Sequence, residues 1–157
     1  MIVFSNTTPF IALSAIGRLD LMQSLFSSVY VVDDVVDECS HGGIIAVPDL
    51  KTLDWIKVVP TYPAAMASIL LELDRGERNT ISTAIDMRAD RIIIDEKIGR
   101  NIADYLGLQV TGTLGILLKA KTSGLIPSFS EAARLMVERG IHYNPKLVER
   151  LVRVAGE

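Results

Sequence analysis

Short apolar runs alternate along the chain with stretches in which apolar residues recur at helical spacing. The run Ile92-Ile93-Ile94 is too short for a helix and β-branched throughout, which is typical of a strand buried on both faces. Ile98 and Ile102 follow at helical spacing, and Gly107 supplies a helix stop. Residues 91–121 therefore predict strand, helix, strand, helix, with parallel strands joined by a right-handed crossover.

The same alternation continues over the whole chain. Further strands are predicted at residues 2–4, 29–32, 56–59 and 108–110, and helices at 10–16, 19–26, 35–39, 66–73, 77–87, 114–121, 129–139 and from 143 or 144 onward, with Pro145 in the first turn of the last. Strands interleaved with helices in this way predict a three-layer α/β domain, a central parallel sheet flanked by helices. The 157 residues suit one such domain, and no repeat or linker divides them.

Hydroxyl and acidic side chains stand where several predicted helices begin. Thr7 or Thr8 is the predicted N-cap of the first helix, and Ser130 is the predicted cap of the helix at 129–139. Asp33 and Asp34 are expected to favour the start of the helix that follows them.

The composition predicts a cytoplasmic protein rather than a membrane protein. Hydrophobic residues make up 49% and mean hydropathy is +0.34, but charges interrupt them, and no run approaches the ~20 apolar residues of a membrane span. The first residues lack the basic start and long apolar core of a signal peptide. Cys39 is the only cysteine, so no internal disulfide is possible. Together these features predict a cytoplasmic protein.

The net charge of −3 gives no overall basic footprint for nucleic acid. Binding of a nucleic acid must then come from a local basic patch or from metal ions that offset a negative site.

Polar residues follow three of the predicted strands. Asn6 with Thr7 follows the first, Asp33 and Asp34 follow the second, and Asp95 with Glu96 follows the strand at 92–94. The carboxyl ends of parallel strands lie at one edge of the sheet, where ligands bind. We therefore expect a site at this edge.

Two further carboxylates, Glu38 and Glu77, belong to predicted helices near this edge. Carboxylates that lie close together repel one another, and such a cluster is usually stabilised by a cation between them. Oxygen ligands favour Mg²⁺ or Mn²⁺ over zinc, and neither a His/Cys zinc spacing nor a glycine-rich phosphate loop is present.

Five segments, in this order, carry a resemblance to the PIN domain family. They are VFSNTTPFI at 3–11, VVDE at 35–38, LDRGE at 73–77, IIDEKIGR at 93–100 and TGTLG at 111–115. The chain resembles the small prokaryotic branch of that family most over residues 1–125, and 126–157 would add C-terminal helices. The resemblance implies a single-strand ribonuclease whose acidic cluster holds Mg²⁺ or Mn²⁺, and many such proteins are toxins of toxin–antitoxin pairs.

The resemblance also assigns metal-binding and catalytic positions. Asn6 takes the first acidic position, Glu38 the second, Glu77 the third and Asp95 the fourth. Active PIN nucleases normally have Asp at the first position. An amide oxygen still ligates a hard cation but adds no charge, so Asn6 is expected to weaken the metal site.

Further residues follow from the same resemblance. Thr7 and Thr113 would hydrogen-bond water or phosphate, and Lys97 and Arg100 would hold the RNA backbone. The expected partners are single-stranded RNA, a small antitoxin protein and a second copy of the chain. The high apolar content supports a homodimer formed through helices that flank the sheet, including residues 66–73.

Ordinary structural roles remain open for the same residues. Asp95 and Thr113 suit helix caps, Glu77 suits a helix N-terminus, Glu38 suits a solvated helix surface and Asn6 suits a turn. At the level of function, a PIN-like module that binds RNA or protein without cleaving it is the main alternative. A third reading is an α/β domain that binds a nucleotide or another phospho-ligand.

Overall fold

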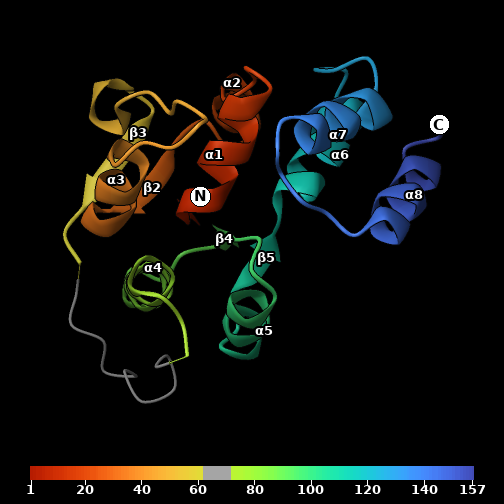
Figure 1. Ribbon diagram of the computed structural model, residues 1–157. Helices are drawn as coiled ribbons and strands as arrows, with labels where there is room; N and C mark the ends of the chain where they lie inside the picture. The colour runs from red at the N-terminus through yellow and green to blue at the C-terminus, as the bar shows by residue number, and fades with distance from the viewer. Residues whose placement is uncertain (62–71) are drawn as a thin grey trace.

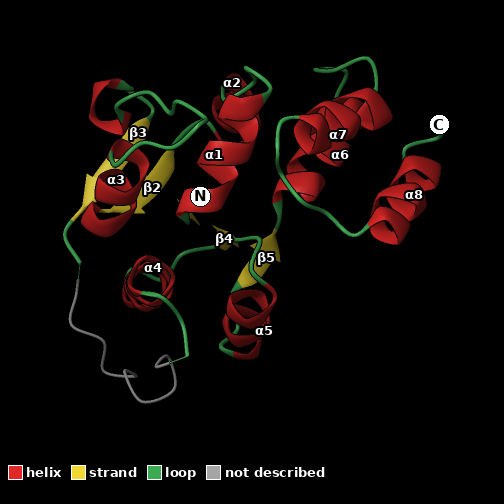
Figure 2. Ribbon diagram, viewed as in Figure 1, coloured by secondary structure: helices red, strands yellow, loops and turns green. Residues whose placement is uncertain are grey.

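The computed structural model describes residues 1–61 and 72–157, which contain a five-stranded parallel sheet (Figures 1 and 2). The strand order is β3-β2-β1-β4-β5. The strands are β1 Val3–Ser5, β2 Val29–Val32, β3 Ile56–Val59, β4 Arg91–Ile93 and β5 Gln109–Thr111. Every strand pair in the sheet is parallel, so all five carboxyl ends lie at one edge.

Helices cover both faces of this sheet. Their bounds are α1 Thr7–Ala15, α2 Asp20–Phe26, α3 Asp33–Ser40, α4 Arg75–Asp86, α5 Lys97–Tyr105, α6 Thr113–Thr122, α7 Phe129–Glu138 and α8 Pro145–Val154, with a short 3₁₀ turn at Leu50–Thr52. Figure 1 shows α4 and α5 on one side of the strands and α1, α2, α6 and α7 on the other. The predicted three-layer α/β architecture is therefore confirmed.

The central strands are buried because their residues are apolar on both faces. All three residues of β1 are buried, and Phe4 lies opposite Tyr30 of β2 on one side and Ile92 of β4 on the other. Phe10 and Phe129, from α1 and α7, are both fully buried in the same core. The first and last thirds of the chain thus share one core, as a single domain requires.

The predicted elements recur in the structure, with some shifted ends. The strand at 29–32 and the strand at 56–59 have the predicted bounds. Asn144 caps α8 through its side chain, which accepts a hydrogen bond from Lys146 N at 2.9 Å, and Pro145 begins the helix as predicted. The predicted helix at 66–73 lies for the most part outside the described residues.

Two predicted caps are wrong. Thr7 and Thr8 lie inside α1, and Asn6 precedes it as the N-cap residue without a side-chain cap bond. Ser128 rather than Ser130 caps α7, because its hydroxyl accepts the hydrogen bond from Glu131 N at 3.1 Å. Cap geometry depends on which residue turns out of the helix, and several neighbouring hydroxyls fit the sequence equally well.

A membrane-spanning helix is not present in residues 1–61 or 72–157, since none of their helices has the length and apolar character required.

Candidate active site

The fold places Asn6 next to the end of β4. The chain passes from β1 to β2 on one side of β1, whereas β4 and β5 lie on the other side. Ligands of open parallel sheets bind where the strand order reverses in this way. At this point the Asn6 N–H donates to the Ile93 carbonyl at 3.0 Å. Asn6 and the segment leading to Asp95 therefore lie side by side at the carboxyl edge.

Asp95 is bound to the first residue of α6. Its carboxylate accepts hydrogen bonds from Thr113 N at 2.7 Å and from Thr113 Oγ1 at 2.6 Å. A carboxylate is favourable at a helix N-terminus, so Asp95 caps α6, while Gly112 occupies the N-cap position. An ionised carboxylate has about four acceptor sites, and this capping role leaves acceptor capacity on Asp95.

Glu38 is held between two other helices. Its carboxylate accepts a hydrogen bond from the Thr7 hydroxyl of α1. Gly76 of α4 lies so close that a Cβ there would come 2.8 Å from Glu38 Cδ. Burial raises the pKa of Glu38, the Thr7 bond lowers it, and the charges of Asp74 and Asp34 raise it further. The carboxylate is thus positioned by neutral groups, and no Lys or Arg of residues 1–61 or 72–157 forms an ion pair with it.

Glu77 lies in the first turn of α4 and is only 5% exposed. Burial raises its pKa to about 7, and the charges of Asp74, Glu96 and Glu38 act in the same direction. The Glu77 Oε1 atom has no hydrogen-bond partner among the described residues. A buried carboxyl oxygen without a partner carries a desolvation penalty that a bound cation would remove.

Asn6 shows the same feature. It is 3% exposed, and its side-chain oxygen Oδ1 is buried without a hydrogen-bond partner in the described part of the chain. Amide and carboxylate oxygens are the donors that Mg²⁺ and Mn²⁺ prefer. The unpaired oxygens of Asn6 and Glu77 are therefore each of a type that binds a hard cation.

The donor set is nevertheless poor in charge. Residues 1–61 and 72–157 contain no group of three His, Cys, Asp or Glu side chains close enough together to hold a metal ion. A cation at this edge would accordingly depend on the neutral Asn6 oxygen in addition to carboxylates.

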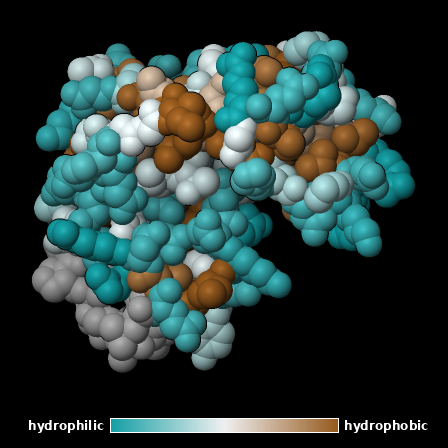
Figure 3. Space-filling view, viewed as in Figure 1, coloured by the Kyte–Doolittle hydropathy of each residue, from teal (hydrophilic) through white to brown (hydrophobic). Residues whose placement is uncertain are grey.

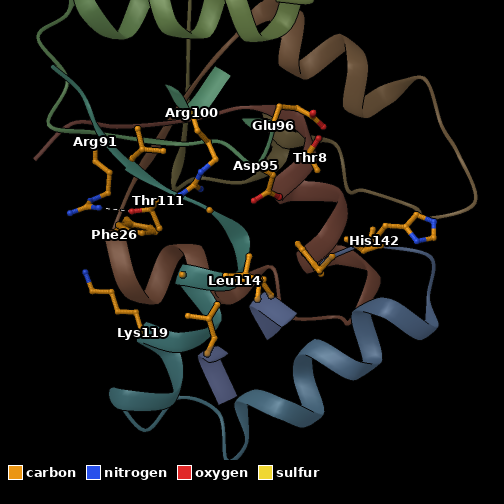
Figure 4. A pocket seen from close by; sticks show the side chains of 17 residues that line it. Thr8, Phe26, Arg91, Asp95, Glu96, Arg100, Thr111, Leu114, Lys119 and His142 are labelled. Carbon is orange, nitrogen blue, oxygen red and sulfur yellow. Dashed lines mark hydrogen bonds between the residues drawn. The ribbon is translucent and has the colours of Figure 1, made fainter. Parts of the chain in front are cut away.

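Two of the four predicted ligands, Asp95 and Glu77, line different cavities, and Asn6 and Glu38 line neither of these two. Asp95 lines a cavity of about 760 Å³ (Figure 4), and Glu77 lines a separate one of about 530 Å³ together with Asp74 and Lys97. Glu96, which follows Asp95, lines both. Glu96 was expected at this strand end together with Asp95, but it was given no ligand or catalytic role.

The predicted phosphate-binding residues differ in accessibility. Thr113 is fully buried and Thr7 is 8% exposed, and each hydroxyl is engaged by a carboxylate, so both lie behind the acidic residues as supports. Lys97 is exposed beside the smaller cavity. Arg100 lines the larger cavity, and its Nη1 donates to the Ile94 carbonyl at 3.1 Å.

Asp34 has a role that the sequence did not indicate. Its carboxylate, 7% exposed, accepts hydrogen bonds from Asn79 at 2.7 Å and Thr61 at 3.2 Å, and it pairs with Arg75 Nε at 2.8 Å. These bonds join α3, which carries Glu38, to the start of α4. Asp34 was expected only to favour a helix start, because a sequence pattern does not show which distant side chains meet.

The lone cysteine is not a candidate nucleophile. Burial raises the pKa of the Cys39 thiol to about 12, and the charge of Glu38 adds to the effect. The residue is therefore a neutral thiol near pH 7, as expected for a small buried side chain.

A parallel sheet with carboxylates and an unpaired amide oxygen at its carboxyl edge places the chain among α/β proteins with a polar, acidic site where the strands end. The family comparison is more specific: residues 2–157 match the PIN domain family DUF3368, and the chain belongs to this family. Predicted membership of the PIN domain family is thus confirmed.

A solved structure gives independent support for the fold. The chain is similar to a PilT N-terminus domain protein, SSO1118, from the hyperthermophilic archaeon Sulfolobus solfataricus P2, with 16% sequence identity and a TM-score of 0.55. The similarity covers 92% of this chain and 98% of that protein. A search among curated proteins found no match. The family generally includes nucleases, which sets the chemistry to consider for the acidic edge.

Proposed function

We propose that this protein is a Mg²⁺- or Mn²⁺-dependent endoribonuclease that acts on single-stranded RNA as the toxin of a toxin–antitoxin pair. The observation that supports this best is the presence of two buried, unpaired oxygen atoms, Asn6 Oδ1 and Glu77 Oε1. A hard cation would give both oxygens a partner and would stabilise the ionised form of Glu77, whose pKa burial raises to about 7.

The chain's own residues would bind and orient the reacting groups. In this proposal Glu38, Glu77 and Asp95 would hold the cation together with Asn6, and binding would have to draw the three carboxylates closer together than they lie in the described structure. Thr7 fixes the Glu38 carboxylate and Thr113 fixes that of Asp95. When bound, the cation would supply a hydroxide nucleophile near neutral pH and stabilise the leaving oxygen.

The RNA backbone would be held by the first turns of α5. Lys97 is exposed beside the Glu77 cavity, and Arg100 lines the Asp95 cavity. These two basic side chains thus line the two cavities that share Glu96, and they would bind phosphates on either side of the cleaved bond.

Cleavage of a single-stranded RNA in Mn²⁺ and in EDTA tests the proposal. The wild-type protein is expected to cleave only with Mn²⁺, and Asp95→Ala is expected to abolish cleavage. Asp104→Ala, which removes an exposed carboxylate of α5, is the matched control and should retain activity. Cleavage that persists in EDTA, or in Asp95→Ala, would contradict the assignment.

The toxin role adds a partner, a small antitoxin protein. The antitoxin gene is expected beside that of the toxin. In equimolar amount, the antitoxin protein should suppress both RNA cleavage and the growth arrest that the toxin causes.

A module that binds RNA or protein without cleavage is the second candidate. It is favoured by the neutral Asn6 and by the lack of three close His, Cys, Asp or Glu side chains in the described part of the structure. Thermal melting separates the two candidates, because a metal site predicts an increase in melting temperature with added Mn²⁺ and a metal-free module predicts none.

A further inference from the structure

The larger cavity, of about 760 Å³, lies between α5, α6 and α8 (Figure 4). Figure 3 shows the molecule hollowed between α5 and α8, with both apolar and hydrophilic residues along the hollow. Cavities of this size hold small organic ligands. Asp95 and Glu96 border it, so a ligand bound here would lie next to the candidate active site.

Three basic side chains line the cavity: Arg91 from β4, Arg100 from α5 and Lys119 from α6. Within the described ranges none of them has a carboxylate within 4 Å, whereas four other basic side chains do form such ion pairs. Figure 4 shows Arg91 and Lys119 along the side of the cavity opposite Glu96, with Asp95 between the two sides. The cavity therefore has a cationic wall that suits an anion.

The cationic groups are held in place by neutral partners. Arg91 donates to the Thr111 hydroxyl and, through Nη2, to the Gln109 side-chain oxygen at 2.8 Å. Lys119 Nζ lies over the ring of Phe26, 5.5 Å from the centroid. Neutral partners orient these groups without cancelling their charge, which lowers the entropic cost of binding an anion.

Gly112 makes room for the third cation. A Cβ at this position would come 2.5 Å from Arg100 Nη1 and 3.0 Å from Asp95 Oδ1. The missing side chain lets the Arg100 guanidinium lie at the turn between β5 and α6, on the Asp95 side of the cavity. The cationic wall thus extends up to the acidic edge.

The remaining lining is largely apolar. It includes Val110 and Leu114 and, from α8, Leu147 and Leu151. Leu147 is 40% exposed, and no residue of α8 is fully buried. An inorganic anion bound to the cations would leave these side chains in water. A ligand with both an anionic group and a flat, weakly polar group would contact both walls.

We propose that this cavity binds a nucleoside phosphate, with the phosphate against Arg91, Arg100 and Lys119 and the base against Val110, Leu147 and Leu151. The inference deepens the proposed function and rests on it for the source of the nucleotide, which is either one unit of an RNA strand leading away from Asp95 or a free mononucleotide. Its binding needs no metal ion.

The test measures binding in EDTA, so that it does not depend on the metal site. Uridine 5′-monophosphate, inorganic phosphate and a single-stranded ribo-oligonucleotide are titrated against the wild-type protein, Lys119→Ala and Lys57→Ala. Lys57 is exposed on the edge strand β3, at the other end of the sheet. Lys57→Ala is therefore the matched control, because it also removes one positive charge. Leu147→Asn tests the apolar wall.

Lys119→Ala is expected to weaken nucleotide binding about tenfold, as for the loss of one charge-assisted contact. It should also reduce the slope of log K against log salt for the oligonucleotide by about 0.7, whereas Lys57→Ala should change neither quantity. Leu147→Asn should weaken binding of the mononucleotide several-fold and leave binding of inorganic phosphate unchanged. Competition between mononucleotide and oligonucleotide identifies the strand as the source, and mononucleotide binding without competition identifies a free nucleotide.

Three results would overturn the inference: no binding of either nucleotide ligand, equal loss in Lys119→Ala and Lys57→Ala, or inorganic phosphate binding as tightly as the mononucleotide. If the metal-nuclease proposal fails instead, Mn²⁺-dependent cleavage of RNA is absent while nucleotide binding in EDTA is intact.

Discussion

Two hydrogen bonds join Asp95 to Thr113, one from the backbone N–H at 2.7 Å and one from the hydroxyl at 2.6 Å. They fix the segment that follows β4 to the start of α6. The same carboxylate that resembles a catalytic acid of the family thus also stabilises the fold. Variants of this pair therefore affect stability and function together, and controls must separate the two.

Thr113→Val removes the hydroxyl bond and keeps the backbone bond. We expect a loss of about 1.5–3 kcal/mol in the free energy of unfolding, since hydrogen bonds to charged groups contribute about that much. For a domain of this size the melting temperature should fall by roughly 3–12 °C. Thr122→Val in the same helix removes an exposed hydroxyl bond to the Lys119 carbonyl and should change melting little. Equal losses in the two variants would contradict the role of Asp95 as the cap of α6.

Glu77 gives the stability of the metal-free protein a predictable pH dependence. Burial raises its pKa to about 7 in the folded state, against 4.5 for an unperturbed carboxyl. The folded state therefore holds a proton that the unfolded state loses, and stability falls as pH rises from about 4.5 to 7. Glu77→Gln lacks this titration, so its stability relative to wild type should rise over this range by at most about 3 kcal/mol.

Thermal melting of both proteins between pH 4.5 and 8 in EDTA measures this difference. Saturating Mn²⁺ should reduce it, because a bound cation stabilises the ionised carboxylate. A difference that stays constant with pH would show that Glu77 titrates normally.

The Asn6→Asp variant tests how the neutral side chain of Asn6 affects metal binding at the site. If the edge binds a cation, the added carboxylate should tighten Mn²⁺ binding by on the order of 1–3 kcal/mol, or roughly tenfold to hundredfold. RNA cleavage should rise in parallel, and Asp95→Ala in the same background should abolish the gain. Without a cation, the new charge lies among like charges and should lower the melting temperature. A destabilised variant that Mn²⁺ does not rescue would favour the non-cleaving module.

Gly76→Ala tests the close approach of α4 to Glu38. The added methyl group would overlap the Glu38 carboxylate, which must move away from Thr7. Overall stability should change little, because alanine is favoured over glycine in a helix by about 1 kcal/mol and offsets part of the strain. Mn²⁺ affinity should fall at least several-fold. Gly43→Ala, where a methyl group meets no atom within 4 Å, should leave both properties unchanged.

The homodimer remains a prediction. Part of its expected interface, residues 66–73, lies mainly outside the described residues, but α5 exposes apolar surface at Ile98 (52%) and Tyr105 (84%). These two side chains lie two turns apart on one helix face. We expect Tyr105→Lys to weaken a dimer at least tenfold in sedimentation or light scattering. A monomeric wild-type mass at micromolar concentration would exclude the dimer.

The sequence predicted the fold well because short β-branched runs and helical periodicity are local signals. Ile92-Ile93-Ile94 predicted a buried strand, and two of these residues lie in β4. The strand-end position of Asn6 also predicted its place at the carboxyl edge, since parallel strands bring their ends to the same side.

Contacts between distant residues were less accessible to prediction. Nothing local in the sequence indicates that Asp34 binds Asn79, or that Asp95 caps a helix eighteen residues later. The division of Asp95 and Glu77 between two cavities likewise depends on the placement of Glu96 in three dimensions.

The candidate ligands come from residues 6, 38, 77 and 95, on four separate segments of the sheet and its helices. A nascent chain cannot assemble this edge until β4 has left the ribosome and docked beside β1, and Asp95 is fixed only once Thr113 begins α6. Under the proposed nuclease function, synthesis would therefore proceed for most of its course before any activity could arise. Fragments that end before β4, whether from truncated messages or from proteolysis, would then lack the proposed activity.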